Sequence, residues 1–225
     1  MQRVDPSILL ENVTDQISSI RTKGIQNNIF THYGVNSNSK KLFKSILYDK
    51  DDNTYIPTGF KNFDSQNRGL PRGGLTLVAA TTSGGKSALA INMAMNMAKW
   101  GARIGFLSLE MTAKETGQRQ MSYLTGLSMS SIIKQELKEK EKRMAMKAHK
   151  KFTKIGKRKG SGVSVIVPEE DISAEEALFL MKPYAYDVII IDYISLLRGV
   201  DDDKQWMKLG AICRFGKRFA SSNHC

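Results

Sequence analysis

Residues 80–87 read ATTSGGKS and lie between an apolar run, LTLVAA at 75–80, and a run of helix formers, ALAINMAMNMAKW at 88–100. A phosphate-binding loop (P-loop) has the pattern Gly, four residues of any kind, and then Gly-Lys-Ser or Gly-Lys-Thr. Gly85, Lys86 and Ser87 match this pattern, and Ala80 stands where the pattern has its first glycine. The sequence therefore predicts a strand, a loop that binds phosphate and a helix in direct succession.

The physical reason for this pattern is the curvature of the backbone. Small residues let the chain curl so that its N–H groups point inward at phosphate oxygens, and the start of the helix adds the positive end of its dipole. We expect Lys86 to reach the terminal phosphates and the Ser87 hydroxyl to ligate Mg²⁺. The alternative is an ordinary glycine-rich turn before a helix. The candidate nucleotide-binding residues are Ala80, Thr81, Thr82, Ser83, Gly84, Gly85, Lys86 and Ser87.

Two carboxylates are candidates for the rest of the site. DVIIIDY at 187–193 is a continuously apolar strand before Asp192, which we expect to order Mg²⁺ at the carboxyl end of the strand. RIGFLSLEM at 103–111 carries Glu110 at the end of a second strand, which we expect to lie beside the P-loop strand. A carboxylate there is placed to take a proton from water that attacks the γ-phosphate. The alternatives are a strand-terminating turn residue for Asp192 and a surface helix-cap glutamate for Glu110.

Strand-like and helical segments alternate along the rest of the chain. A helical pattern covers 113–123, a lysine-rich helix is expected from about 134 to 153, and VSVIV at 163–167 is strand-like. Ser173 and Glu176 have the spacing of a capping box that opens another helix. Buried strands separated by helices predict an α/β fold, with a mostly parallel sheet covered by helices on both faces.

The first 54 residues are expected to form a separate helical segment. Apolar residues recur there at the spacing of one helix face, which predicts an amphipathic helix. We expect its apolar face to pack against the rest of this chain or against a neighbouring subunit. These apolar residues are Ile8, Leu9, Val13, Ile17 and Ile20. The predicted organisation is a helical linker and subunit-docking segment at 1–54, followed by the phosphate-binding domain at 55–225.

Composition sets further bounds. The 225 residues are 41% apolar and 25% charged, which is ordinary for a globular protein, and the sequence contains no apolar run long enough to cross a membrane. Cys213 and Cys225 lie too near the C-terminus to staple the fold, which favours a reducing compartment. The net charge of the chain is +12, and most of it comes from residues 134–159, which contain twelve lysines and arginines and three glutamates. This window is either a solvated helix face or a contact for nucleic acid.

Four stretches together resemble the ATPase domain of DnaB-type replicative DNA helicases. These stretches are PTGFKNFD at 57–64, LPRGGLTLVAATTSGGKSALAINMA at 70–94, IGFLSLEM at 104–111 and VIIIDYISLL at 188–197. Ala80 fits this family, in which alanine is common at the first P-loop position, and the family's SLEM glutamate is the catalytic base, which would be Glu110. The resemblance implies a RecA-like P-loop NTPase core that binds ATP and Mg²⁺.

The same resemblance implies partners and a location. Single-stranded or forked DNA would be the substrate, homo-hexameric rings the assembly, and a primase or helicase loader a partner, with no membrane association. The location would be cytoplasmic, or the host cytoplasm if the chain is viral.

Three features depart from the family pattern. Ser195 stands near a position where the family usually has glutamine, the helical N-terminal domain is not found, and the chain stops where the next core strand would begin. The domain is therefore expected to be incomplete at its C-terminus, without the family's DNA-binding loops and arginine finger. Two other functions stay open: another RecA-like motor, such as a recombinase or KaiC-like ATPase, and a truncated, non-catalytic ATP-binding or nucleic-acid-interaction module.

Overall fold

The computed structural model describes residues 54–81, 83–199 and 205–225, together with Lys44 and Leu47. The chain divides into two units, Met1–Asp52 and Asn53–Cys225. The second unit carries the fold and is treated by itself. The apolar stripe expected between residues 8 and 20 lies outside the described residues.

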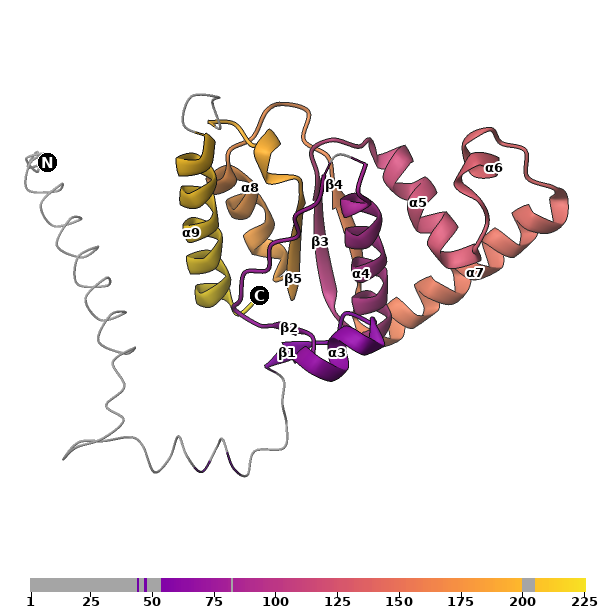
Figure 1. The fold of residues 1–225 in the computed structure, drawn as a ribbon. Coiled ribbons are helices and arrows are strands. Elements are labelled where there is room, and N and C mark those ends of the chain that lie inside the picture. Colours follow the sequence, from indigo (N-terminus) through magenta and orange to yellow (C-terminus); the bar gives the residue numbers. More distant parts are fainter. Residues whose placement is uncertain (1–43, 45–46, 48–53, 82, 200–204) are drawn as a thin grey trace, which may run out of the picture. The chain divides into compact units, whose positions relative to one another are not determined.

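A parallel sheet forms the centre of the unit (Figure 1). Its middle strand is β3 (Arg103–Ser108), which pairs on one side with β4 (Gly162–Ile166) and on the other with β5 (Val188–Asp192), both in parallel. Phe106 lies opposite Val165 in one ladder and opposite Ile190 in the other. The three strands carry β-branched and apolar side chains on both faces, and such strands are stable only where both faces are covered.

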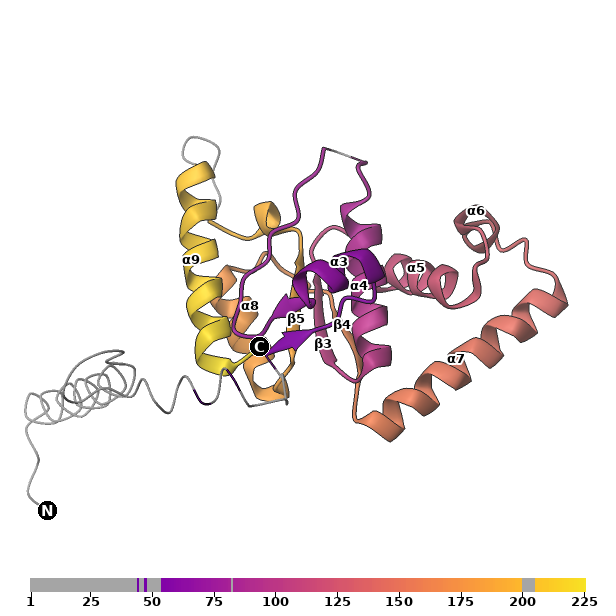
Figure 2. The same ribbon diagram turned by 60° about the horizontal axis from the view of Figure 1, so that its bottom comes forward.

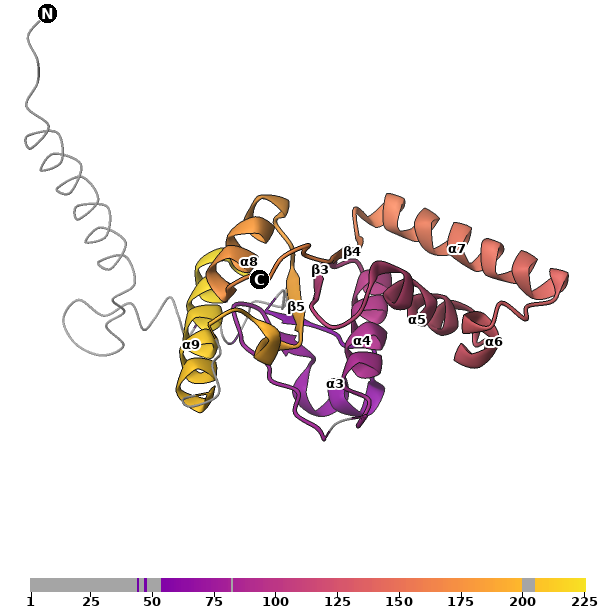
Figure 3. The same cartoon turned by 90° about the horizontal axis from the view of Figure 1, so that it is seen from above.

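Helices flank this sheet. The helices of the unit after the hairpin are α4 (Lys86–Trp100), α5 (Ala113–Thr125), α6 (Met129–Ile133), α7 (Glu139–Lys159), α8 (Ala174–Met181) and α9 (Gln205–Asn223). α4 covers one face and α8 with α9 the other, while α6 packs on α5 and α7 packs on α4 and α5. Ile104 and Phe106 of β3 pack with Ile91 and Met95 of α4 in one core. Leu107 of β3 lies on the opposite face and packs with α8 and with side chains of α9 in a second core. The predicted α/β class with a helix-flanked parallel sheet is confirmed (Figure 3).

Two short strands precede the sheet and form a hairpin of their own. β1 (Tyr55–Ile56) pairs in antiparallel with β2 (Leu70–Pro71), and α3 (Lys61–Asn67) connects them. The Asp64 carboxylate accepts hydrogen bonds from the Thr58 and Gly59 amides at 2.9 and 2.8 Å. These bonds fix the turn that leads from β1 into α3.

The expected strand at 75–80 is not formed. These residues are coil and run beside β5 toward α4 (Figures 1 and 2), and no ladder joins them to a described strand. Leu75, Leu77 and Val78 are 42%, 61% and 48% exposed. A strand needs a neighbour to receive its hydrogen bonds, and β5 pairs with β3 alone. The prediction that the Glu110 strand lies beside the P-loop strand is also wrong, because β4 and β5 occupy both edges of β3.

The lysine-rich helix is displaced from its expected bounds. The chain forms the short α6 first, Gln135 takes a left-handed φ of 59°, and α7 then runs from Glu139 to Lys159. The amide of Lys138 donates to the Glu141 carboxylate at 2.7 Å and starts α7. Gly160, with φ 66°, ends it, because a left-handed residue at the end of a helix favours glycine.

Smaller predictions have definite outcomes. The Ser173 amide and the Glu176 side chain, with the Ser173 hydroxyl and the Glu176 amide, form the expected capping box of α8. Both cysteines are free thiols in the described chain. No helix in the described ranges has the length and apolarity to span a bilayer.

Candidate nucleotide-binding site

The loop from Ala80 to Ser87 turns tightly before it enters α4. The Gly84 amide donates to the Thr81 carbonyl at 3.0 Å, which closes a turn. A Cβ at Gly84 would lie 2.9 Å from the Cβ of Ala80, too close for any side chain. Gly85 has φ 83°, a conformation that glycine adopts without strain. The two glycines are thus required by the backbone path itself.

The start of α4 is open to an anion. Gly85 is the N-cap, and none of the described side chains caps the first turn of the helix. The first amides of a helix have no partner inside the helix and together carry a partial positive charge. A phosphate group is a suitable acceptor for them.

The Lys86 ammonium lies folded back over the loop. Its Nζ donates to the carbonyl oxygens of Ala80 at 2.8 Å and of Thr81 at 3.0 Å. These two carbonyls were not anticipated from the sequence, since backbone acceptors leave no mark in a motif. Ser87 is half-buried, and its hydroxyl bonds to none of the described groups. The Lys86 ammonium and the Ser87 hydroxyl therefore lie at the loop without a negatively charged partner among the described residues.

Two further residues of the predicted loop are Ser83 and Thr82. Ser83 has a left-handed φ of 60° and is exposed. Thr82 lies outside the described residues.

Asp192 ends β5 as a buried carboxylate. It is 4% exposed, and its Oδ2 atom is buried without a hydrogen-bond partner among the described residues. An unpaired buried carboxylate oxygen is costly unless a cation or donor satisfies it. Asp192 and Lys86 line the same cavity, whose volume is about 260 Å³. The structure thus brings the predicted lysine and the predicted acid of Mg²⁺ binding to one hollow.

Glu110 follows the end of β3 in an exposed bend. Ser108, the last residue of β3, is in register with Asp192, and the Leu109 amide donates to the Asp192 carbonyl at 2.9 Å. The Ser108 hydroxyl donates to the Met111 carbonyl at 2.7 Å and fixes the bend around Glu110. Glu110 and Asp192 therefore lie at the same edge of the sheet, on adjacent strands.

The cavity itself is mostly apolar. One wall is the free edge of β5, the other is the coil from Gly74 to Val78, and α4 and α9 contribute side chains. At the amino end of β5 it reaches Asp187, whose carboxylate pairs with the Arg72 guanidinium at 2.9 Å. Sequence reasoning missed this pair, since the two residues lie far apart in the chain.

The residues present fit Mg²⁺ bound together with phosphate. The described part of the chain contains no cluster of three or more His, Cys, Asp or Glu that could hold a metal by itself. Mg²⁺ is commonly bound by one or two carboxylates plus substrate phosphates and water. The unpaired Asp192 Oδ2 and the Ser87 hydroxyl have the oxygen chemistry that this mode needs.

The sequence of the second unit matches a known protein family. The family described as "DnaB-like helicase C terminal domain" matches residues 55–225.

Curated relatives are similar over much of the chain. The "probable plasmid replicative DNA helicase" of Chlamydia trachomatis is 29% identical over 233 residues, which are 97% of this chain and 51% of the relative. The "replicative DNA helicase DnaB" of Geobacillus stearothermophilus is 29% identical over 162 residues, 71% of this chain and 35% of the relative. The chain thus spans about half the length, or less, of these relatives.

Two solved structures share the fold. One, described as an ATPase domain, has a TM-score of 0.68 at 22% identity, and the match covers 85% of this chain and 69% of that chain. The other is a DnaB-like replicative helicase, solved in a study of its interactions with primase. It has a TM-score of 0.69 at 20% identity, and the match covers 97% of this chain and 54% of that chain.

Proposed function

This chain belongs to the DnaB-like helicase C-terminal domain family, and we propose on that premise that it forms the ATP-hydrolysing core of a replicative DNA helicase. ATP hydrolysis would be coupled to translocation on single-stranded DNA and to unwinding of the duplex. The observation that carries the proposal is the meeting of Lys86 and Asp192 in one cavity, with Glu110 at the end of the adjoining strand.

Binding begins with the phosphates of ATP. The amides of the first turn of α4 meet no side-chain cap among the described residues and can donate to phosphate oxygens. On binding, the Lys86 ammonium would leave the two backbone carbonyls to which it donates and would contact the terminal phosphates. Its hydrogen bonds to charged phosphate oxygens are stronger than those to neutral carbonyl oxygens. Loop residues Ala80, Thr81, Thr82, Ser83, Gly84, Gly85, Lys86 and Ser87 form this part of the proposed site.

The remaining residues handle the metal and the water. Asp192 and Ser87 would hold Mg²⁺, which neutralises part of the phosphate charge when it is bound. Glu110 would accept a proton from the water that attacks the γ-phosphate, and its exposed position leaves it open to that water. The burial of Asp192 and the exposure of Glu110 are consistent with these two different proposed roles.

Partners are part of the same proposal. Single-stranded or forked DNA is the proposed substrate and a homo-hexameric ring the proposed assembly, with residues 1–54 as the subunit-docking segment and 55–225 as the ATPase domain. A primase or a loader is the proposed protein partner, and one structural neighbour was itself studied for its interactions with primase. The proposed location is the cytoplasm.

ATPase measurements with and without single-stranded DNA test this function. We expect DNA to stimulate turnover, Lys86→Ala to abolish ATP binding, and Glu110→Gln to keep binding while turnover falls about 10²- to 10⁴-fold. Glu170→Gln is the matched control, because Glu170 is exposed and lies outside the cavity. Normal turnover in Lys86→Ala would remove the site assignment.

Two other results would redirect the function. ATP binding without DNA-stimulated turnover would favour a non-catalytic module. DNA-stimulated turnover without displacement of a strand from forked DNA would favour another RecA-like motor.

A further inference from the structure

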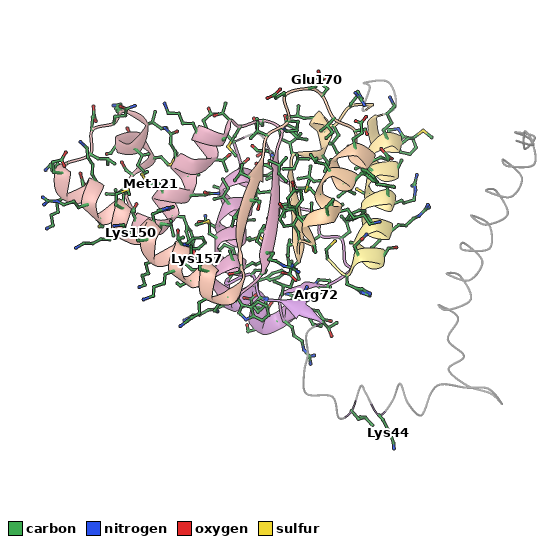
Figure 4. All side chains as sticks on the ribbon, turned by 180° about the vertical axis from the view of Figure 1, so that it is seen from behind. Lys44, Arg72, Met121, Lys150, Lys157 and Glu170 are labelled. Carbon is green, nitrogen blue, oxygen red and sulfur yellow. The ribbon has the colours of Figure 1, made fainter. Side chains whose placement is uncertain are left out.

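Helix α7 presents a straight row of cations on its outer face. Arg143, Lys147, Lys150, Lys154 and Lys157 recur at spacings of four, three, four and three residues, and all five are exposed. This spacing places them on one face of a helix. Figure 4, in which Lys150 and Lys157 are labelled, shows nitrogen-tipped side chains standing out from α7. We refer to these five residues as the cation row.

The opposite face of α7 attaches the helix to the domain. Ala145, Ala148, Phe152 and Ile155 are half-buried, and Phe152 packs against the core around α4. At the end of α7 the Lys159 ammonium donates to the carbonyls of Lys99 and Trp100 at 2.9 and 2.7 Å. The inner face is therefore occupied by the fold, and the cation row is fixed in its outward direction.

The row lacks anionic partners within the described residues. Lys147, Lys150, Lys154 and Lys157 form no ion pair or hydrogen bond there, and Arg143 donates only to the backbone carbonyl of Glu139. Each pair of like charges three or four residues apart on a helix destabilises it by about 0.2–0.5 kcal/mol. An external anion would relieve this repulsion along the whole row.

A hollow lies on the same surface, with a volume of about 350 Å³. It is lined by His149, Lys150, Thr153, Lys154 and Lys157, mainly through their carbon atoms. The polar ends of these side chains are groups that donate to phosphate oxygens.

The composition of the row favours one kind of anion. From Arg143 to Lys157 a helix rises about 21 Å at about 1.5 Å per residue, a length over which several phosphates of a nucleic-acid backbone come within reach. Proteins that hold single strands add aromatic side chains for the bases to stack on. Phe152 is the only phenylalanine, tyrosine or tryptophan of α7, and it lies on the inner face. The row has charge without such stacking groups.

We propose that the cation row of α7 binds the phosphate backbone of double-stranded DNA, independently of sequence. This surface is distinct from the nucleotide site, because α7 is fastened to the last residues of α4 while Lys86 is the first. The proposal goes beyond the helicase function and does not need ATP to bind.

The test is duplex binding without nucleotide, monitored by fluorescence anisotropy of a short labelled DNA between about 50 and 200 mM salt. For duplex DNA the logarithm of affinity falls with the logarithm of salt by about 0.9 per phosphate contact. We expect the variant Lys150→Gln/Lys154→Gln/Lys157→Gln to lower this slope by about 2.7, from three lost contacts. Circular dichroism checks that the helix is retained.

A matched control removes the same charge elsewhere. Lys61, Lys114 and Lys182 are exposed and lie on three different elements, and their replacement by Gln should leave the slope unchanged. Lys86→Ala should bind duplex as the unmodified chain does, so that failure of the ATPase assignment and failure of this proposal are separable.

Four outcomes would overturn the proposal. They are the absence of duplex binding, equal loss of slope in both triple variants, tighter binding of single strands than of duplex, and competition by polyglutamate as effective as competition by unlabelled DNA.

Discussion

At the scale of single residues, the site contains two polar groups whose natural partners are a phosphate and a cation. Lys86 donates to neutral carbonyls, and the Asp192 Oδ2 atom bonds to no described group. Lys86 and Asp192 line one cavity, and no ion pair joins them. A nucleotide with its metal would satisfy both groups.

Asp192→Asn should raise the stability of the folded chain but weaken the binding of ATP with Mg²⁺. Removing an unsatisfied buried charge relieves a desolvation cost, so we expect the variant without nucleotide to unfold a few degrees higher, corresponding to about 1 kcal/mol. It should also lose the stabilisation that ATP and Mg²⁺ give the unmodified chain. Thermal melts in chelator and in ATP with Mg²⁺ measure both effects. Equal stabilisation of the two proteins by ATP and Mg²⁺ would show that Asp192 does not hold the metal.

At the scale of elements, Asp187 ties the start of β5 to two other segments. Its carboxylate accepts from the Arg103 amide at 2.8 Å and from the Arg72 guanidinium at 2.9 Å. Burial acts to raise the pKa of Asp187, but these hydrogen bonds outweigh it and hold the pKa below its ordinary value. A carboxylate with a lowered pKa stabilises the folded chain above the pKa of the unfolded state and loses this effect as pH falls through the folded pKa.

Asp187→Asn should therefore destabilise most at neutral pH. We expect a loss of about 1–3 kcal/mol at pH 7, from broken charge-assisted hydrogen bonds, and a smaller difference from the unmodified chain as pH falls below about 4. Urea unfolding across this range measures it. Asp171→Asn is the control, since Asp171 is exposed. A loss that stays constant down to the lowest pH would contradict the ion-pair explanation.

The coil at 75–79 gives a second prediction for an element. Its backbone forms no hydrogen bond with the described residues, whereas β3 is paired on both edges. Hydrogen exchange should therefore be more than about a thousandfold faster at 75–79 than at the amides of β3. Protection of 75–79 equal to that of β3 would mean that this segment is a paired strand after all.

The same elements show what sequence reasoning can find. Local signals were reliable: the Ser173–Glu176 capping box and the apolar runs at β3 and β5 were all placed correctly. The run at 75–80 has the composition of a strand, but a strand depends on a neighbour that composition does not reveal. The predicted boundaries of α7 were wrong for a similar reason, because the break at Gln135 is a backbone conformation without a sequence signature.

The site shows the same division. Lys86, Ser87 and Asp192 could be chosen from a spacing and from an apolar strand that ends in an acid. That Lys86 and Asp192 line one cavity, and that Glu110 follows the strand paired with the one that ends in Asp192, depends on the order of the strands. The assigned roles of these residues remain predictions.

At the scale of the whole domain, helix α4 connects the two proposed functional surfaces. The nucleotide loop leads into its first turn, and α7 with its cation row is fastened to its last residues. One 15-residue helix thus connects the proposed ATP site with the proposed DNA surface. Residues 134–159, which include α7, carry twelve lysines and arginines and three glutamates, a net charge of +9 out of the +12 of the chain.

A crystal structure with a non-hydrolysable ATP analogue and Mn²⁺ tests the account most directly. We predict triphosphate density on the amides that begin α4, the Lys86 ammonium moved from its carbonyls onto a phosphate, and an anomalous manganese peak within bonding distance of Asp192. Phosphates bound elsewhere, or a metal peak away from Asp192, would contradict the account.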